Sequence, residues 1–213
     1  TDWHGSLEAY HAAKAKVYQH VRTACVYPAT DRRVERMVEE ADVVEGARAV
    51  GVTLGAPGPS QLGVVEGLLC DRAFGPDRQR TAIELAELSD LAHLVAGDVP
   101  PYLVINALAA AALCRAVGVA PTAVRDGLRG FRLDHHRTAW VRDLDGVAYV
   151  DDSKATNAHA VEAAFGGRAP RSVVWLAGGV AKGQEFSGLV AAIAPRVRAA
   201  VLTPHAGEFG KLF

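Results

Sequence analysis

The sequence predicts an α/β protein of two domains, the second of which is Rossmann-like with a mainly parallel sheet. An apolar run at 147–150 predicts a buried strand, and residues 158–165 predict the helix that follows it. A second strand, at 172–177, precedes another helix and a third strand that begins near Ala199. Strands and helices that alternate in this way are typical of parallel sheets joined by crossover helices.

The first half of the chain also alternates, and we expect a first domain over residues 1–133 and a second over 134–213. Helices are expected at 7–21, 31–41, 102–117 and 121–130, and strands at 23–27 and 47–53. Residues 62–74 predict a hairpin around Gly67, in which Asp71 and Arg72 are expected to form an exposed pair. Residues 83–91 fit a strand or a helix equally well.

The composition excludes several classes of protein. A formal net charge of −1 and a pI near 6.7 give no field that would hold nucleic acid. Half of the residues are apolar, but no apolar run is long enough to cross a membrane. Cys25, Cys70 and Cys114 are odd in number and lie in apolar segments, which predicts reduced thiols. We therefore expect a cytoplasmic protein without a nucleic-acid or membrane partner. A monomer is expected as well, although the composition does not give the oligomeric state.

The polar stretch after the strand at 147–150 is the strongest candidate for a functional site. It begins with Asp151 and Asp152 and continues through Ser153 and Lys154 to Asn157. A helix N-terminus offers unpaired N–H donors and a positive dipole end to an anion, and a lysine adds a full charge. The alternative is a capped helix with solvated acids, and the spacing alone does not separate the two.

The string Asp-Ser-Lys-Ala-Thr-Asn at 152–157 resembles the signature of the Mur ligases. Other stretches are similar to the same family in the same order, and together they cover about residues 2–200. They are Asp-Trp-His-Gly-Ser at 2–6 with Tyr-x-Ala-Ala-Lys at 10–14, Asn-Ala-Leu-Ala-Ala at 106–110, His-Arg at 136–137, and Gly-Gly at 178–179 followed by Lys182. The resemblance implies part of a central ATP-binding domain followed by part of a C-terminal ligase domain.

The resemblance also implies an activity. Among Mur ligases, the motifs look like those of the members that add D-glutamate to UDP-N-acetylmuramoyl-L-alanine in peptidoglycan precursor synthesis. ATP and Mg²⁺ are the implied cofactors, and the reaction passes through an acyl phosphate that the amine of D-glutamate attacks. The alternatives are another Mur ligase, an amide ligase similar to the folylpolyglutamate synthases, and a non-catalytic fragment.

Lys14 is the candidate metal ligand. It falls on an apolar helical stripe formed by Leu7, Tyr10, Val17, Tyr18 and Val21, so we expect it on the buried face. Burial lowers the pKa of a lysine, although such a side chain often snorkels to water instead. The resemblance implies that Lys14 is carbamylated and that its carbamate lies beside Mg²⁺, which makes it a catalytic residue.

The resemblance assigns roles to further residues of the sequence. It places Arg137 and Lys154 in catalysis, Arg137 and Asp152 against the nucleotide, and Asn106 against the adenine. Tyr102 and Leu103 stand where the family has a histidine and a first asparagine. Ser153, Thr156 and Lys182 are implied to position D-glutamate.

The two ends of the sequence have distinct features. A Gly-x-x-x-x-Gly-Lys-Ser/Thr phosphate loop is absent from the sequence, and Met37 is its one methionine. Together with the start at Thr1, this predicts a fragment that does not use ATP by itself. Residues 202–209 resemble instead a segment of the ribokinase-like dehydratases that repair hydrated NAD(P)H.

Overall fold

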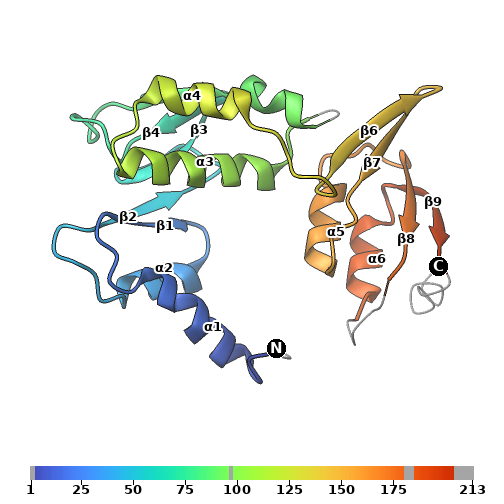
Figure 1. Ribbon diagram of the computed structural model, residues 1–213, viewed down its shortest axis with the longest axis horizontal. Coiled ribbons are helices and arrows are strands. Elements are labelled where there is room, and N and C mark those ends of the chain that lie inside the picture. The colour runs from blue at the N-terminus through green and yellow to red at the C-terminus, as the bar shows by residue number, and fades with distance from the viewer. Residues whose placement is uncertain (1–2, 96–97, 180–184, 204–213) are drawn as a thin grey trace. The chain divides into compact units, whose positions relative to one another are not determined.

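The computed structural model describes residues 3–95, 98–179 and 185–203, and the chain divides into two compact units (Figure 1). Unit 1 comprises Thr1–His93 and Leu103–Phe131, and unit 2 comprises Leu94–Tyr102 and Arg132–Phe213. None of the helices in these described ranges is long and apolar enough to cross a membrane.

Unit 1 contains a mixed sheet of five strands in sequential order. The strands are β1 (Ala24–Pro28), β2 (Arg48–Val52), β3 (Gln61–Val65), β4 (Leu68–Asp71) and β5 (Ile83–Glu87). The first three run parallel, whereas β3–β4 and β4–β5 are antiparallel pairs. The predicted hairpin is therefore confirmed, with Gly67 at positive φ in its turn.

The helices of the first half of the chain begin where local sequence signals place them, but the helix expected over 7–21 ends as a regular α-helix at Ala15. They are α1 (Leu7–Ala15), α2 (Arg32–Glu39), α3 (Pro101–Ala116) and α4 (Pro121–Gly130), with 3₁₀ helices η1 (Lys16–Tyr18) and η2 (Leu88–Leu94). All lie in unit 1 except the last residue of η2 and the first two of α3, which belong to unit 2. The side chains of Ser6 and Asp31 accept N-capping hydrogen bonds at α1 and α2. Pro101 and Pro121 occupy first helical positions, where a missing N–H costs nothing. The ambiguous stretch 83–91 is a strand followed by a 3₁₀ helix.

The core of unit 1 forms between the sheet and α3. Buried apolar side chains from β2 to β5 include Val50, Leu62, Leu69 and Leu85, and α3 adds Leu108. The alanines of α3 at 107, 111 and 112 are also buried, so this face of the helix is covered by the rest of unit 1. Figure 1 shows α2 beside β1, which it contacts, with α1 next to it.

Asp71 and Arg72 are not the exposed pair that the sequence predicts. Asp71 is fully buried, and its Oδ1 accepts hydrogen bonds from the backbone N–H groups of Ala73 and Phe74, at 2.7 and 2.8 Å. Its Oδ2 lies 3.0 Å from Nε of Arg115 at the end of α3. Arg72 is half-buried and donates to backbone carbonyls, among them that of Pro57. Asp71 therefore holds the loop after the hairpin in place, and Arg72 also holds the loop before it.

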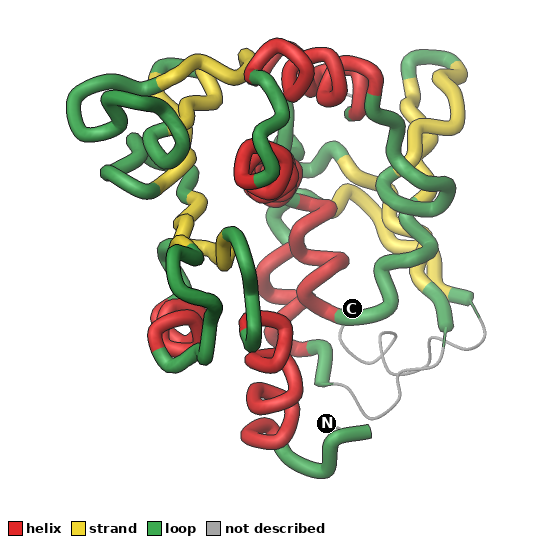
Figure 2. The backbone as a smooth tube through the Cα atoms, turned by 60° about the vertical axis from the view of Figure 1, so that its left-hand side comes forward, coloured by secondary structure: helices red, strands yellow, loops and turns green. Residues whose placement is uncertain are grey.

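Unit 2 consists of a hairpin followed by alternating helices and strands. Its elements are β6 (Ala139–Leu144), β7 (Val147–Asp151), α5 (Ala158–Phe165), β8 (Val173–Ala177), α6 (Ser187–Ile193) and β9 (Val197–Leu202). The hairpin turn, green between two yellow strands in Figure 2, has Asp145 and Gly146 at positive φ. β8 and β9 pair in parallel, with α6 as the crossover.

The strand at 147–150 is present, but the prediction that it is buried is wrong. Val147 and Tyr149 keep 53% and 45% of their surface exposed. Within the described residues, β6 and β7 pair with each other as a sheet of two. The core of unit 2 lies elsewhere, where Phe165, Phe186 and Ile193 pack beneath β8 and β9. Helices α5 and α6 contact each other over this core and leave the hairpin uncovered.

Candidate functional site

The polar stretch 151–157 forms a tight turn between β7 and α5, in unit 2. The backbone N–H of Ala155 donates to the carbonyl of Asp152 at 2.8 Å, which closes the turn. The side chain of Asn157 then accepts a hydrogen bond from the N–H of Ala160 at 3.0 Å and caps α5. The chain therefore enters α5 with its polar residues held at the positive end of the helix.

Asp151 anchors the turn to the segment that precedes β6. Its Oδ2 lies 2.6 Å from Nδ1 of His136, and its Oδ1 accepts a hydrogen bond from the N–H of Ser153 at 3.0 Å. The bond from Ser153, followed by the one from His136, lowers the pKa of Asp151 to about 2.

The depressed pKa of Asp151 predicts a pH dependence of stability. Because the carboxyl binds a proton less readily in the folded chain, its stabilising contribution is complete above the ordinary pKa, near 4. It is lost as pH falls through the folded value of about 2. We expect the difference in unfolding free energy between wild type and Asp151→Asn to shrink between about pH 4 and 2. Urea unfolding at several pH values measures it.

The control for this prediction is Asp143→Asn, which removes an exposed carboxylate from the neighbouring strand β6. Its unfolding free energy is expected to follow that of the wild type across the same range. A difference between wild type and Asp151→Asn that stays constant from pH 5 to 2 would contradict the assignment.

Asp152 is half-buried and is hydrogen-bonded to Thr138, the residue just before β6. Its Oδ1 accepts hydrogen bonds from the backbone N–H and the hydroxyl of Thr138, at 2.8 and 3.2 Å. Burial raises the pKa of Asp152, and the two bonds from Thr138 and the charge of Arg137 partly offset that effect. Tyr102 extends the contact, because its hydroxyl lies 3.1 Å from that of Thr138.

The two cations in and beside this turn face solvent. Arg137 and Lys154 are both exposed, and neither forms an ion pair with any residue that the structure describes. The backbone N–H of Lys154 donates to the carbonyl of His136 at 3.0 Å, which fixes the base of its side chain. Ser153 and Thr156 are also exposed. Two exposed cations, two hydroxyls and a carboxylate, in and beside the turn that leads into α5, form a set suited to an anionic ligand that carries hydroxyls.

Lys14 is exposed in the structure, so the prediction that it lies on a buried face is wrong. The regular helix ends at Ala15, and none of the residues of α1 is buried. The ammonium of Lys14 lies 5.4 Å from the ring centre of Tyr10. Both line a hollow of about 410 Å³ within unit 1. Its other lining residues are His11, Val17, Tyr18, Asp31, Arg33, Val34 and Met37.

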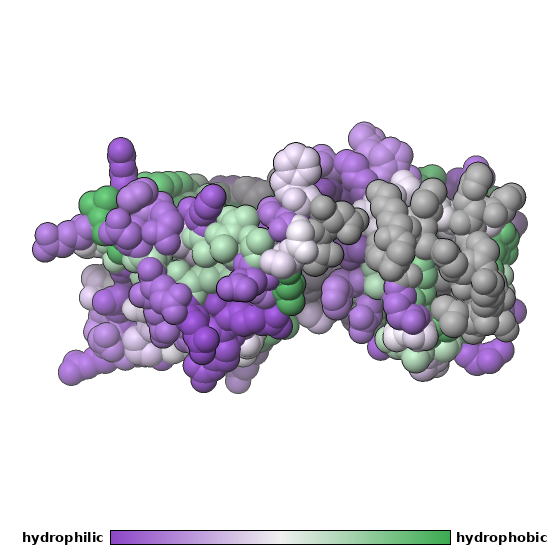
Figure 3. Space-filling model, turned by 90° about the horizontal axis from the view of Figure 1, so that it is seen from below, coloured by the Kyte–Doolittle hydropathy of each residue, from purple (hydrophilic) through white to green (hydrophobic). Residues whose placement is uncertain are grey.

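Figure 3 shows purple, hydrophilic side chains on the face of unit 1 that is seen from below, with green, hydrophobic areas among them. Among the described residues, no group of three or more histidine, cysteine, aspartate or glutamate side chains is placed to hold a metal ion. Asp31, the one acid among the residues that line the hollow, caps α2 with its carboxylate. Lys14 is therefore one potential ligand, and its carbamylation stays a prediction.

The remaining predicted residues are placed as follows. Asn106 lies exposed in the second turn of α3, and with Lys14 it belongs to unit 1. Arg137, Asp152, Ser153, Lys154 and Thr156 belong to unit 2. Lys182 and residues 204–209 lie outside the described part of the chain. A single cleft that contains all of these side chains stays a prediction.

Sequence reasoning missed Thr138 as a site residue and treated Tyr102 only as a departure from a motif. Thr138 has a φ of +48°, which is rare for a β-branched residue. His136, two residues earlier, has a φ of +69°. Such backbone conformations cost about 1–3 kcal/mol each and persist where surrounding contacts hold them. The adjacent His-Arg motif was the one sequence signal near Thr138.

Comparisons with known proteins bear on this arrangement. Over 201 residues, 94% of the chain, the sequence is 59% identical to the UDP-N-acetylmuramoylalanine–D-glutamate ligase of Streptomyces coelicolor. It is 60% identical over the same length to the ligase of that name from Streptomyces avermitilis, and 57% identical to that from Leifsonia xyli subsp. xyli. The chain belongs to the Mur ligase family.

Only part of these relatives is matched. The chain spans 41% of the Streptomyces coelicolor ligase, 42% of the Streptomyces avermitilis one and 38% of the Leifsonia one. The fold also matches a solved Mur ligase, MurF from Acinetobacter baumannii, with a TM-score of 0.59 and 14% identity. That match covers 93% of this chain and 47% of MurF. No family model matches the chain.

Proposed function

We propose that this chain is part of an ATP-dependent ligase that joins D-glutamate to UDP-N-acetylmuramoyl-L-alanine. The observation that supports this best is the identity of 57–60% to three ligases of that name over 94% of the chain. The signature at 152–157 and the His-Arg motif at 136–137 are therefore not isolated matches, because they lie in a chain that is similar to these ligases over 94% of its length. The proposal includes a cytoplasmic location and a monomeric state.

The turn of unit 2 supplies groups that such a reaction needs. Charge builds on phosphate oxygens as a carboxylate is activated, and it must be met by cations already in place. Arg137 can pair two oxygens at once through its planar guanidinium, and Lys154 adds a point charge. Asp152 can accept a hydrogen bond from a ribose hydroxyl, while Ser153 and Thr156 can bind the carboxylates of D-glutamate together with Lys182.

The predicted site residues include several groups that could bind the nucleotide, but only one that could bind Mg²⁺. Exposed cations and a half-buried carboxylate at the N-terminus of α5 match a phosphate tail and its ribose. ATP would supply the phosphoryl group that activates the acid. For Mg²⁺, Lys14 is the one predicted ligand, and it would bind only as a carbamate, because an ammonium has no lone pair to offer.

The test is a ligation assay with the protein encoded by the complete reading frame that contains this sequence. It is incubated with ATP, Mg²⁺, UDP-N-acetylmuramoyl-L-alanine and one radiolabelled amino acid at a time. We expect D-glutamate alone to be incorporated, with release of one phosphate per amide bond. Incorporation of a different amino acid would indicate another amide ligase, and ATP turnover without any incorporation would contradict the proposal.

A further inference from the structure

Three side chains of unit 2 form a continuous line of hydrogen bonds that ends on Asp152. The hydroxyl of Tyr102 lies 3.1 Å from that of Thr138, which lies 3.2 Å from Oδ1 of Asp152. An ionised carboxylate only accepts hydrogen bonds, so Thr138 must donate to Asp152. The hydroxyl oxygen of Thr138 then accepts the proton of Tyr102. The charge on Asp152 thus sets the direction of both bonds.

These hydrogen bonds hold Oδ1 of the Asp152 carboxylate and leave Oδ2 available to accept a hydrogen bond from a ligand. Oδ1 of Asp152 accepts two hydrogen bonds from Thr138, one from its backbone N–H at 2.8 Å and one from its hydroxyl. Within the described residues, Oδ2 accepts no hydrogen bond. Two bonds to one oxygen from a single residue restrict rotation of the carboxylate, so the free oxygen points in a defined direction.

The local backbone is consistent with this positioning role. Thr138 has a φ of +48°, a conformation that a β-branched residue adopts only where its surroundings hold it. Its contact with Asp152 provides such a restraint.

We propose that Tyr102 and Thr138 are positioning residues that orient Asp152 toward a hydroxyl of the nucleotide ribose. This inference rests on the proposed function, because it assigns to Asp152 the nucleotide contact that a ligase of this family needs. Neither Tyr102 nor Thr138 contacts the reacting atoms in this scheme, and both act through Asp152.

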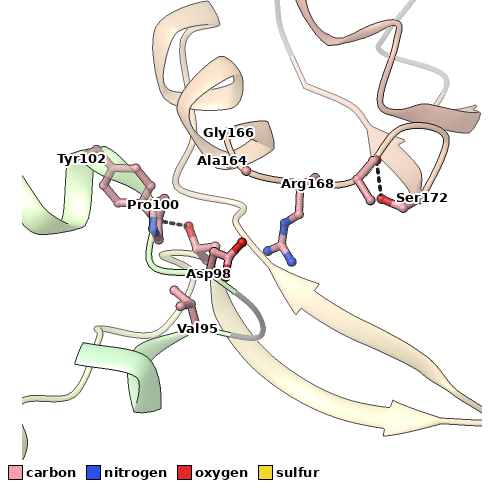
Figure 4. A pocket seen from close by; sticks show the side chains of 11 residues that line it. Val95, Asp98, Pro100, Tyr102, Ala164, Gly166, Arg168 and Ser172 are labelled. Atoms are coloured by element: carbon pink, nitrogen blue, oxygen red, sulfur yellow. Dashed lines mark hydrogen bonds between the residues drawn. The ribbon is translucent and has the colours of Figure 1, made fainter. Parts of the chain in front are cut away.

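The same unit provides a matched control. Tyr102 and Thr138 line a cavity of about 290 Å³ that is also lined by Asp98, Arg168 and Ser172. Figure 4 shows the side chains of Asp98 and Arg168 pointing toward one another there. Ser172 donates its hydroxyl hydrogen to the carbonyl of Ala169 at 2.7 Å, and no hydrogen bond joins it to Asp152 within the described residues. Ser172→Ala therefore removes a hydroxyl from the same cavity and leaves the hydrogen bonds between Tyr102, Thr138 and Asp152 intact.

The experiment measures the steady-state kinetics of ligation with the complete protein as ATP is varied. We expect Thr138→Val, which removes a hydrogen bond to a charged group, to raise the KM for ATP about 10- to 100-fold. Tyr102→Phe is expected to raise it about 3- to 10-fold, because it removes a bond between neutral groups. For both variants kcat should change by less than about threefold, since the reacting atoms are not touched.

Two further variants separate positioning from a purely structural role. Thr138→Ser keeps the hydroxyl and should restore the KM to within about twofold of the wild type, as should the control Ser172→Ala. In an Asp152→Asn background, Thr138→Val should add little to the KM for ATP, because the group it orients is already lost.

The possible results distinguish this inference from the proposed function. If Asp152→Asn raises the KM for ATP while Thr138→Val and Tyr102→Phe leave it unchanged, the inference is overturned and the proposed function stands. The same holds if Thr138→Val lowers only the thermal unfolding midpoint. A wild-type protein that does not consume ATP overturns both.

Discussion

Lys154→Ala is expected to lower the kcat of ligation about 100- to 1,000-fold, the usual effect of removing one preorganised donor to a developing negative charge. The turn between β7 and α5 fixes the base of this side chain, because its backbone N–H donates to the carbonyl of His136 at 3.0 Å. Its ammonium remains exposed and without an ion pair among the described residues, so it is free to meet a phosphate. Initial rates at saturating ATP and D-glutamate measure the effect.

Two controls accompany Lys154→Ala. Lys16→Ala removes an exposed lysine from unit 1 and should leave kcat within about twofold of the wild type. Lys154→Arg keeps the positive charge and should therefore recover part of the rate. The recovery should be incomplete, because a guanidinium is larger and less mobile than an ammonium. If Lys154→Ala ligates as fast as Lys16→Ala, the assignment of Lys154 to catalysis is wrong.

Much of the secondary structure could be predicted from the sequence, because its signals are local. Ser6, Asp31 and Asn157 cap helices through their own side chains, and such caps involve residues two or three positions apart. The turn at Asp145-Gly146 depends on the tolerance of these two residues for positive φ. Local chemistry of this kind is visible in a sequence without any knowledge of the fold.

Burial was predicted less well, because it depends on which surfaces meet. The apolar run at 147–150 forms a strand, yet the helices of unit 2 pack on β8 and β9 and leave that strand exposed. Lys14 lies on an apolar stripe of α1, yet none of the residues of α1 is buried. In both places the apolar pattern of the sequence shows which face of a strand or helix could be buried. Only the tertiary structure shows whether another element packs on that face.

The candidate site was predicted where a motif is contiguous and missed where contacts join distant segments. Residues 152–157 are consecutive, so their chemistry can be recognised directly. Thr138 lies 14 residues before Asp152, and Tyr102 lies a further 36 residues before Thr138. No periodicity links these positions, and the partner of Asp152 becomes evident only in the folded chain.

Asp71→Ala is expected to lower the free energy of unfolding of unit 1 by about 3–5 kcal/mol, because it breaks a buried ion pair from one side. The guanidinium of Arg115, whose side chain is 11% exposed, would lose the carboxylate that lies 3.0 Å from its Nε. The N–H groups of Ala73 and Phe74 would also lose their acceptor. Arg115 lies in the last turns of α3, the helix that carries Asn106, so this pair also fixes a predicted adenine contact.

Hydrogen exchange of the amides in β3 and β4 is the appropriate measurement, because it reports on unit 1 separately from unit 2. The exposed Asp77 lies in the loop that follows β4, and Asp77→Ala is expected to change the opening free energy by less than about 0.5 kcal/mol. Arg115→Met should cost less in the Asp71→Ala background than alone, since it then removes an uncompensated charge. Equal protection in Asp71→Ala and Asp77→Ala would show that the buried pair does not stabilise unit 1.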